Sequence, residues 1–88
     1  MDFSRALEIM KDGQKLTRKS WKSKDIWVTV ISNWSIPTVH SMELFPNGDK
    51  AIEFSVFLAI KTANGRLSPW TPFQTDLLSE DWMLVENL

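Results

Sequence analysis

Cysteine is absent from this chain of 88 residues, which holds one histidine and three glycines. Without cysteine, disulfides, thiolate metal sites and a cysteine nucleophile are excluded. His40 has no neighbours at a metal-ligand spacing, so we interpret it as a loop or surface histidine. Each glycine lies at a predicted helix end or turn, so no glycine-rich phosphate loop is expected. The sequence therefore predicts no metal site, no cofactor and no catalytic residue.

A strong net charge and long apolar runs are also missing. The formal net charge is −1, whereas proteins that bind DNA or RNA are usually strongly basic, so nucleic acid is not an expected partner. No apolar run reaches the length of about eighteen residues that a membrane span needs, and no signal-peptide core follows Met1. These absences predict a cytoplasmic protein with no membrane partner.

Basic side chains are concentrated in one short stretch. Six of the ten lie between residues 11 and 24, namely Lys11, Lys15, Arg18, Lys19, Lys22 and Lys24. From residue 76 to the last residue there are four acidic side chains and no basic one. The basic stretch can meet a small anionic ligand, or it can be a solvated turn.

The residue pattern predicts an α+β fold in a single ligand-binding domain, residues 1–88. Residues 3–12 carry one apolar stripe at helical spacing, which predicts a helix packed on a sheet. The stripe consists of Phe3, Ala6, Leu7 and Met10. Asp2 is the expected N-cap of this helix, and Gly13 is the expected left-handed residue after it.

About five short strands, mostly antiparallel, are expected after the helix. Residues 26–32 are rich in β-branched and aromatic side chains, and residues 51–62 alternate with a period of two. Asn64-Gly65 predicts a hairpin turn between the latter strand and a return strand that Pro69 stops. Further elements are predicted as strands at 14–18, 66–68 and 82–86, a helical turn at 73–78 and a turn at 46–49. The pattern leaves the rest of 33–50 undefined.

Glu80 and Asp81 are adjacent carboxylates. Adjacent side chains point apart on a strand and diverge on a helix, so these two make a poor acid–base pair. We interpret them as solvated acids of a turn or cap that begins near Ser79.

Five tryptophans are many for so short a chain. Trp27 and Trp82 lie in predicted strands and are expected in the core, while Trp34 is undecided. Trp21 lies in a polar basic loop and Trp70 lies between two prolines, where a large indole needs a pocket or a partner. Either ring can stack on a nucleobase beside basic residues, and either can equally anchor a subunit interface.

Gln74, Thr75 and Asp76 follow Trp70 closely. Gln and Asp side chains offer the donors and acceptors that read base edges and ribose hydroxyls. A structural cap for the helical turn at 73–78 explains the same residues equally well.

Two segments of the chain resemble the Thoeris anti-defense two family. FSRALEIMKDGQKLTRKSW (3–21) is similar to its opening helix, glycine, basic strand and tryptophan turn. IKTANGRLSPWTPFQTDLLSEDW (60–82) resembles its closing hairpin, tryptophan, Gln-x-Asp-Leu-Leu and Asp-Trp. Residues 33–59 match only in length and strand character. Ser20 stands where the family commonly has glycine, and residues 21–23 (WKS) replace a Trp-Asn-Gly turn.

The resemblance implies a phage-encoded, non-enzymatic protein that acts in the cytoplasm of the bacterial host. Such proteins look like homotetramers, dimers of dimers. They sequester glyco-cyclic ADP-ribose, the signal made by the TIR enzyme of the Thoeris defence, without cleaving it. Some relatives also bind cyclic oligonucleotides from another defence pathway at a separate site.

The resemblance also implies roles for single residues. Trp21 and Trp70 would stack on the adenine or line its slot, and Arg18 would approach the pyrophosphate. Hydrogen bonds to base and ribose would come from Gln74, Thr75 and Asp76. The basic loop and the Gln-Thr-Asp segment would come from different subunits, so that binding depends on assembly.

Other functions stay open on the residues alone. One is a sponge for cyclic oligonucleotides of the CBASS type. Another is a protein-binding module that grips its partner with the loops of Trp21 and Trp70. A nucleotide-cleaving hydrolase is a third, although the sequence offers it no evident base or metal set. A DNA or RNA binder is disfavoured by the nearly neutral charge.

Overall fold

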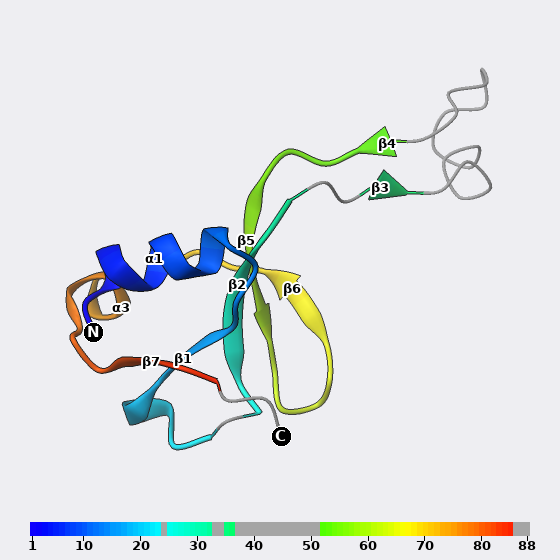
Figure 1. Cartoon of the computed structure of the whole chain (residues 1–88). Coiled ribbons are helices and arrows are strands. Elements are labelled where there is room, and N and C mark those ends of the chain that lie inside the picture. Colours follow the sequence, from blue (N-terminus) through cyan, green and yellow to red (C-terminus); the bar gives the residue numbers. More distant parts are fainter. Residues whose placement is uncertain (24, 33–34, 37–51, 86–88) are drawn as a thin grey trace.

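A helix, a five-stranded antiparallel sheet and a short helix before the last strand make up the fold (Figure 1). The structure is a computed structural model that describes residues 1–23, 25–32, 35–36 and 52–85. The expected α+β class is confirmed. In chain order the elements are α1 (Phe3–Lys11), β1 (Leu16–Arg18), a 3-10 turn (Lys19–Trp21), β2 (Trp27–Ile31), β3 (Ser35–Ile36), β4 (Ile52–Glu53), β5 (Phe57–Lys61), β6 (Leu67–Pro69), α3 (Gln74–Leu78) and β7 (Trp82–Leu84).

The first helix begins and ends where its sequence signals predict. The Asp2 carboxylate accepts a hydrogen bond from the backbone N–H of Arg5 at 2.9 Å, which satisfies one of the free donors of the first turn. Gly13 lies past the last turn with a φ of 89°, a conformation that costs glycine little. The predicted helix, its N-cap and its left-handed glycine are confirmed.

The five-stranded sheet has the order β6-β5-β2-β1-β7, and all neighbouring strands are antiparallel. Leu16 pairs with Val28, and Val28 pairs with Ile60, so these side chains form one row across the sheet. Because side chains alternate between the two faces of a strand, the row lies on one face. The helix α1 packs against β2 and β1 over this face (Figure 1).

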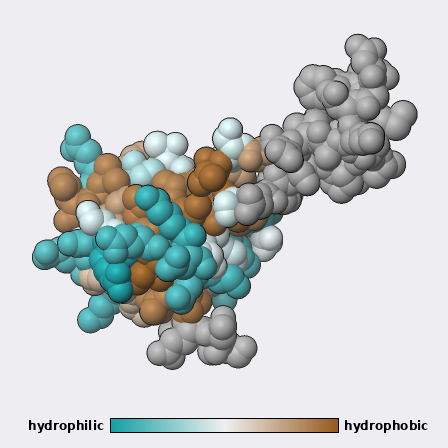
Figure 2. All heavy atoms as spheres, turned by 45° about the horizontal axis from the view of Figure 1, so that its top comes forward, coloured by the Kyte–Doolittle hydropathy of each residue, from teal (hydrophilic) through white to brown (hydrophobic). Residues whose placement is uncertain are grey.

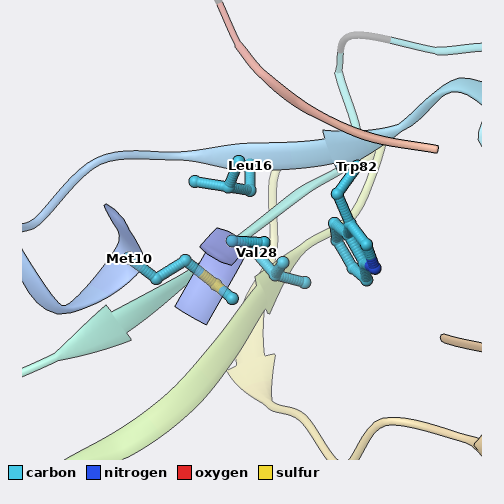
Figure 3. Close-up of a cluster of buried hydrophobic side chains, with 5 residues drawn as sticks. Met10, Leu16, Val28 and Trp82 are labelled. Atoms are coloured by element: carbon cyan, nitrogen blue, oxygen red, sulfur yellow. The ribbon is translucent and has the colours of Figure 1, made fainter. Parts of the chain in front are cut away.

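The core lies between α1 and that face of the sheet. Its buried members are Ala6, Met10, Leu16, Val28 and Trp82, each at most 2% exposed. Figure 3 shows Met10 of the helix beside Val28 of β2, with Leu16 and Trp82 on the neighbouring strands. Trp82 is thus in the core, as predicted.

The expectation that Trp27 lies in the core is wrong. It follows the period-two alternation onto the face of β2 opposite Val28, away from the core cluster, and is half-buried. The Nζ atoms of Lys15 and Lys61 lie 4.8 and 6.0 Å from its ring centroid, which is the geometry of cation–π contacts.

The single strand predicted at 51–62 is observed as two strands, β4 and β5. The ladder between β5 and β2 ends where Phe57 pairs with Ile31. Residues 54–56 therefore leave regular pairing, and β4 pairs with β3 in a separate two-stranded sheet. This second sheet projects from the body as an arm (Figure 1), and apolar surface borders its base (Figure 2).

The hairpin between β5 and β6 turns at Asn64-Gly65, as predicted. Gly65 has a φ of 84°, and the backbone N–H of Thr62 donates to the carbonyl of Arg66 at 2.9 Å. The return strand continues through Pro69, which pairs with Ala59, because an edge strand tolerates a residue without an N–H. The predictions for Lys24, Trp34, His40 and the turn at 46–49 lie outside the described residues.

Candidate functional site

The loop that carries Trp21 is held by the residue before the last strand. The backbone N–H of Lys19 donates to the carbonyl of Asp81 at 3.0 Å, and that of Ser20 donates to the Asp81 carboxylate at 3.0 Å. Lys22 then turns the chain with a φ of 54°, in the left-handed region. These contacts fix the 3-10 turn so that Trp21 is half-buried against the body.

Trp70 reaches the same place from the other edge of the sheet. It follows β6 directly, and its backbone N–H donates to the carbonyl of Leu58 at 2.9 Å. The centroids of the Trp21 and Trp70 rings are 6.3 Å apart, with the ring planes at 90°. Behind them lies the buried ring of Trp82, at 5.4 Å from Trp21 and 6.1 Å from Trp70. Each of these edge-to-face contacts adds to the apolar burial of the rings.

An open cleft of about 290 Å³ lies beside the two half-buried tryptophans. Its lining is aromatic and aliphatic with one carboxylate, and consists of Trp21, Ile26, Ile60, Trp70, Phe73 and Asp76. Small-molecule pockets span about 300–1,000 Å³, so this cleft suits one base-sized group more than a whole dinucleotide. Phe73 at its rim is 75% exposed.

Asp76 is the polar group of the cleft, and it is 5% exposed. Its carboxylate accepts from the backbone N–H of Phe73 at 2.8 Å, which caps the start of α3. Its backbone carbonyl accepts from Nε1 of Trp82 at 2.9 Å. The helix α3 is thereby attached both to its own first turn and to the core.

Arg18 ties β1 to α3 and to the segment between α3 and β7, which are distant from β1 in sequence. Its Nη1 donates to Asp76 at 2.8 Å, its Nε to Asp81 at 2.9 Å, and its Nη2 to the hydroxyl of Ser79 at 2.6 Å. The side chain is 13% exposed, and the two carboxylates are 7% and 27% exposed. Charge-assisted pairs of this kind are stronger than neutral hydrogen bonds. We call Arg18, Asp76, Ser79 and Asp81 the arginine cluster.

The ionisation of the cluster follows from its geometry. The hydrogen bond from Arg18, with a further contribution from the N–H of Ser20, lowers the pKa of Asp81 to about 2. The hydrogen bond to Asp81 in turn raises the pKa of Arg18, so the guanidinium stays charged. One cation thus meets two carboxylates, and the cluster as a whole is acidic.

The residues predicted for the site are brought together only in part. Trp21, Trp70 and Asp76 line the cleft, and Arg18 contacts Asp76 at 2.8 Å. Gln74 and Thr75 lie on exposed positions of α3 and are not among the lining residues.

Asp81 and Ser79 contact the candidate site residue Arg18, and the sequence did not predict these contacts. The interpretation of Asp81 as a solvated acid is wrong, since it binds both Arg18 and the Trp21 loop. Arg18 lies opposite Trp82 in the strand register, and Asp81 is the residue just before Trp82. Only this pairing of β1 with β7, across more than sixty residues, brings the Asp81 carboxylate to the Arg18 guanidinium. No local signal in the sequence indicates it.

The described part of the chain offers neither a metal-binding cluster nor a membrane-spanning helix. Among residues 1–23, 25–32, 35–36 and 52–85, no group of three or more His, Asp or Glu side chains could hold a metal ion. Across those ranges, no helix has the length and apolar character needed to cross a bilayer.

Comparisons with known proteins cover almost the whole chain. The family model described as "Tad2-like: Thoeris anti-defense 2-like domain" matches residues 1–85. A protein of Bacillus phage SP01 named "Thoeris anti-defense 2" is 33% identical over 87 residues, which span 97% of this chain and 94% of that protein. The matched residues include the cleft and the arginine cluster.

Proposed function

This chain belongs to the Thoeris anti-defense 2-like family, and on that premise we propose that it is a phage anti-defense protein that sequesters a cyclic nucleotide immune signal. The proposed ligand is glyco-cyclic ADP-ribose, held without cleavage so that the Thoeris effector is not activated. The observation that carries the proposal is the open cleft lined by Trp21 and Trp70, with the Asp76 carboxylate in its wall.

The chemistry of the cleft supports a nucleobase as the bound group. An indole offers a flat π-face, and stacking of a base on such a ring contributes roughly 1–3 kcal/mol. A buried carboxylate oxygen accepts hydrogen bonds, which suits an exocyclic amino group or a ribose hydroxyl. We therefore propose that Trp21 and Trp70 contact the adenine and that Asp76 accepts from base or ribose. Gln74 and Thr75 are proposed to reach the ligand from α3.

Assembly is part of the proposal. Three large apolar side chains on and beside α3 are exposed: Phe73 by 75%, Leu77 by 43% and Leu78 by 80%. Apolar residues grouped in this way favour contact with another protein surface. We propose that they contact a second copy of the chain in a homotetramer, and that the ligand is closed in between copies. The same surface would serve a module that binds a different protein.

The sponge is tested by recovery of the ligand. The protein is mixed with glyco-cyclic ADP-ribose, separated from free ligand by filtration, heated, and the released compound is identified by mass spectrometry. Intact cyclic ligand is the expected product, whereas linear ADP-ribose would indicate a hydrolase and would overturn the proposal. Native mass spectrometry with glyco-cyclic ADP-ribose and with cyclic oligonucleotides reports the subunit number and ligand preference. Failure to bind either, with capture of a host protein, would favour the protein-binding module.

A further inference from the structure

A second hollow, of about 230 Å³, has one member of the arginine cluster in its lining. It is lined by Thr17, Arg18, Lys19, Lys22, Ser23 and Met83. Arg18 belongs to this hollow and Asp76 belongs to the cleft, and the two side chains are joined at 2.8 Å. The Arg18–Asp76 pair therefore links a residue of the hollow to a residue of the cleft.

The two depressions differ in charge. The cleft has a carboxylate and no basic side chain in its lining, whereas the hollow has three basic side chains and no carboxylate. The positive charge of Arg18 is already compensated by Asp76 and Asp81. A phosphate that approached Arg18 from the cleft would meet more negative than positive charge, which disfavours binding there.

Lys19 and Lys22 differ from Arg18, because no carboxylate in the described part of the chain compensates their charge. Both are exposed, and within the described ranges neither takes part in an ion pair. Their backbone is nonetheless fixed, because the N–H of Lys19 donates to Asp81 and the N–H of Lys22 donates to the carbonyl of Lys19 at 3.2 Å. Anchored backbone reduces the ordering cost of binding, and two ammonium groups at the edge of one hollow suit the oxygens of a pyrophosphate.

We propose that this hollow is the phosphate subsite of the protein, with Lys19 and Lys22 as its anion-binding residues and Arg18 as a positioning residue in its wall. This subsite rests on the proposed function, because it assumes that one nucleotide binds with its base and its pyrophosphate in different depressions. The base occupies the acidic, aromatic cleft, and the pyrophosphate lies over the basic hollow. Arg18 keeps the two apart by holding β1, α3 and the residue before β7 in place.

The first experiment uses inorganic pyrophosphate and the amide NMR spectrum of the full chain. We expect saturable shifts of the residue 19–23 amides. The double variant K19Q/K22Q should raise the dissociation constant roughly tenfold or more, as expected for losing charge-assisted hydrogen bonds, while K11Q, which removes an exposed charge on α1, should leave it unchanged. Equal losses in K11Q and K19Q/K22Q, or no saturable shift, would overturn the subsite. This readout does not depend on nucleotide binding, so it separates the subsite from the sponge.

The second experiment separates the two roles of Arg18 with glyco-cyclic ADP-ribose, by calorimetry at low and high salt. If Arg18 positions the walls, D81N and R18K both weaken binding, because each breaks the cluster while Lys19 and Lys22 keep their charge. The dissociation constant of D81N and R18K then depends on salt as strongly as that of the natural chain. Only K19Q/K22Q shows a weaker salt dependence. If Arg18 holds phosphate directly, D81N removes a competing carboxylate and strengthens binding, and R18K retains most of it. That second pattern would overturn the inference while leaving the sponge intact.

Discussion

The indole of Trp21 stands perpendicular to the indole of Trp70, with the ring centroids 6.3 Å apart. Two perpendicular rings do not form a parallel slot. A base that stacks on one indole would meet the other with its edge. The two rings would therefore contact one face and one edge of the bound group. The buried ring of Trp82 supports both from behind, which makes the site an extension of the core.

Loss of either cleft tryptophan should weaken nucleotide binding. We expect Trp21→Leu and Trp70→Leu each to raise the dissociation constant for glyco-cyclic ADP-ribose. The rise should be roughly tenfold to a hundredfold for the ring on which the base stacks, and smaller for the perpendicular ring, which the base meets only with its edge. Isothermal titration calorimetry measures this. Trp27→Leu is the matched control, because Trp27 lies on the opposite face of the sheet between two lysines. An equal loss in the control would show that the effect is not local to the cleft.

The exposed apolar side chains of α3 should control assembly. Leu78 is 80% exposed, so Leu78→Glu changes little in the isolated subunit but places a charge in any interface formed there. Native mass spectrometry should show a shift to smaller species. Ser4→Glu adds the same charge at an exposed position of α1 and should leave the assembly unchanged. An unaltered subunit number in Leu78→Glu would place the interface elsewhere.

Acid should destabilise the protein through Asp81. Its pKa is about 2 when folded, because of the hydrogen bond from Arg18, against an ordinary value of 3.8. A depressed folded-state pKa contributes stability that is fully present above the unfolded value and is lost as the pH falls from about 4 through 2. Chemical denaturation over this range should show the decline. Asp81→Asn should be less stable at neutral pH and should show a smaller decline; an unchanged pH profile would contradict the ion pair.

Trp82 should matter most for stability. Its side chain is fully buried, and Nε1 donates to the carbonyl of Asp76 at 2.9 Å. Trp82→Phe removes this donor, leaves a buried carbonyl unpaired and opens a small cavity, which should lower the free energy of unfolding by about 2–4 kcal/mol. Urea denaturation measures the change. Trp27→Phe, at a half-buried tryptophan outside the core cluster, should cost clearly less.

The local elements were predictable because their signals lie within a few residues. The apolar stripe of α1, the Asp2 cap and the Asn64-Gly65 turn each depend on neighbours in sequence, and all are confirmed. The break between β4 and β5 was not predictable, because alternation continues through it. It occurs where the partner strand β2 ends at Ile31, a property of the sheet and not of the segment.

The candidate site was predictable only in its aromatic part. Trp21 and Trp70 lie in loops with prolines or charges around them, where an indole needs a partner, and the structure lines one cleft with both. Asp81 was missed because adjacent acids at a turn usually face solvent. Its partner Arg18 is 63 positions away in sequence and is reached only when β1 and β7 pair.

The sequence by itself determined the element types, the absence of thiol chemistry, the two loop tryptophans and the likeness to an anti-defense family, because these depend on residue identity and short spacing. The tertiary structure alone decided which charges are already neutralised and which remain available. The pairing of β1 with β7 brings Asp81 to Arg18, and the position of α3 brings Asp76 there. Lys19 and Lys22 have no ion pair in the described part of the chain. Electrostatic pairing depends on distance in space, and no count of charges along the chain contains that distance.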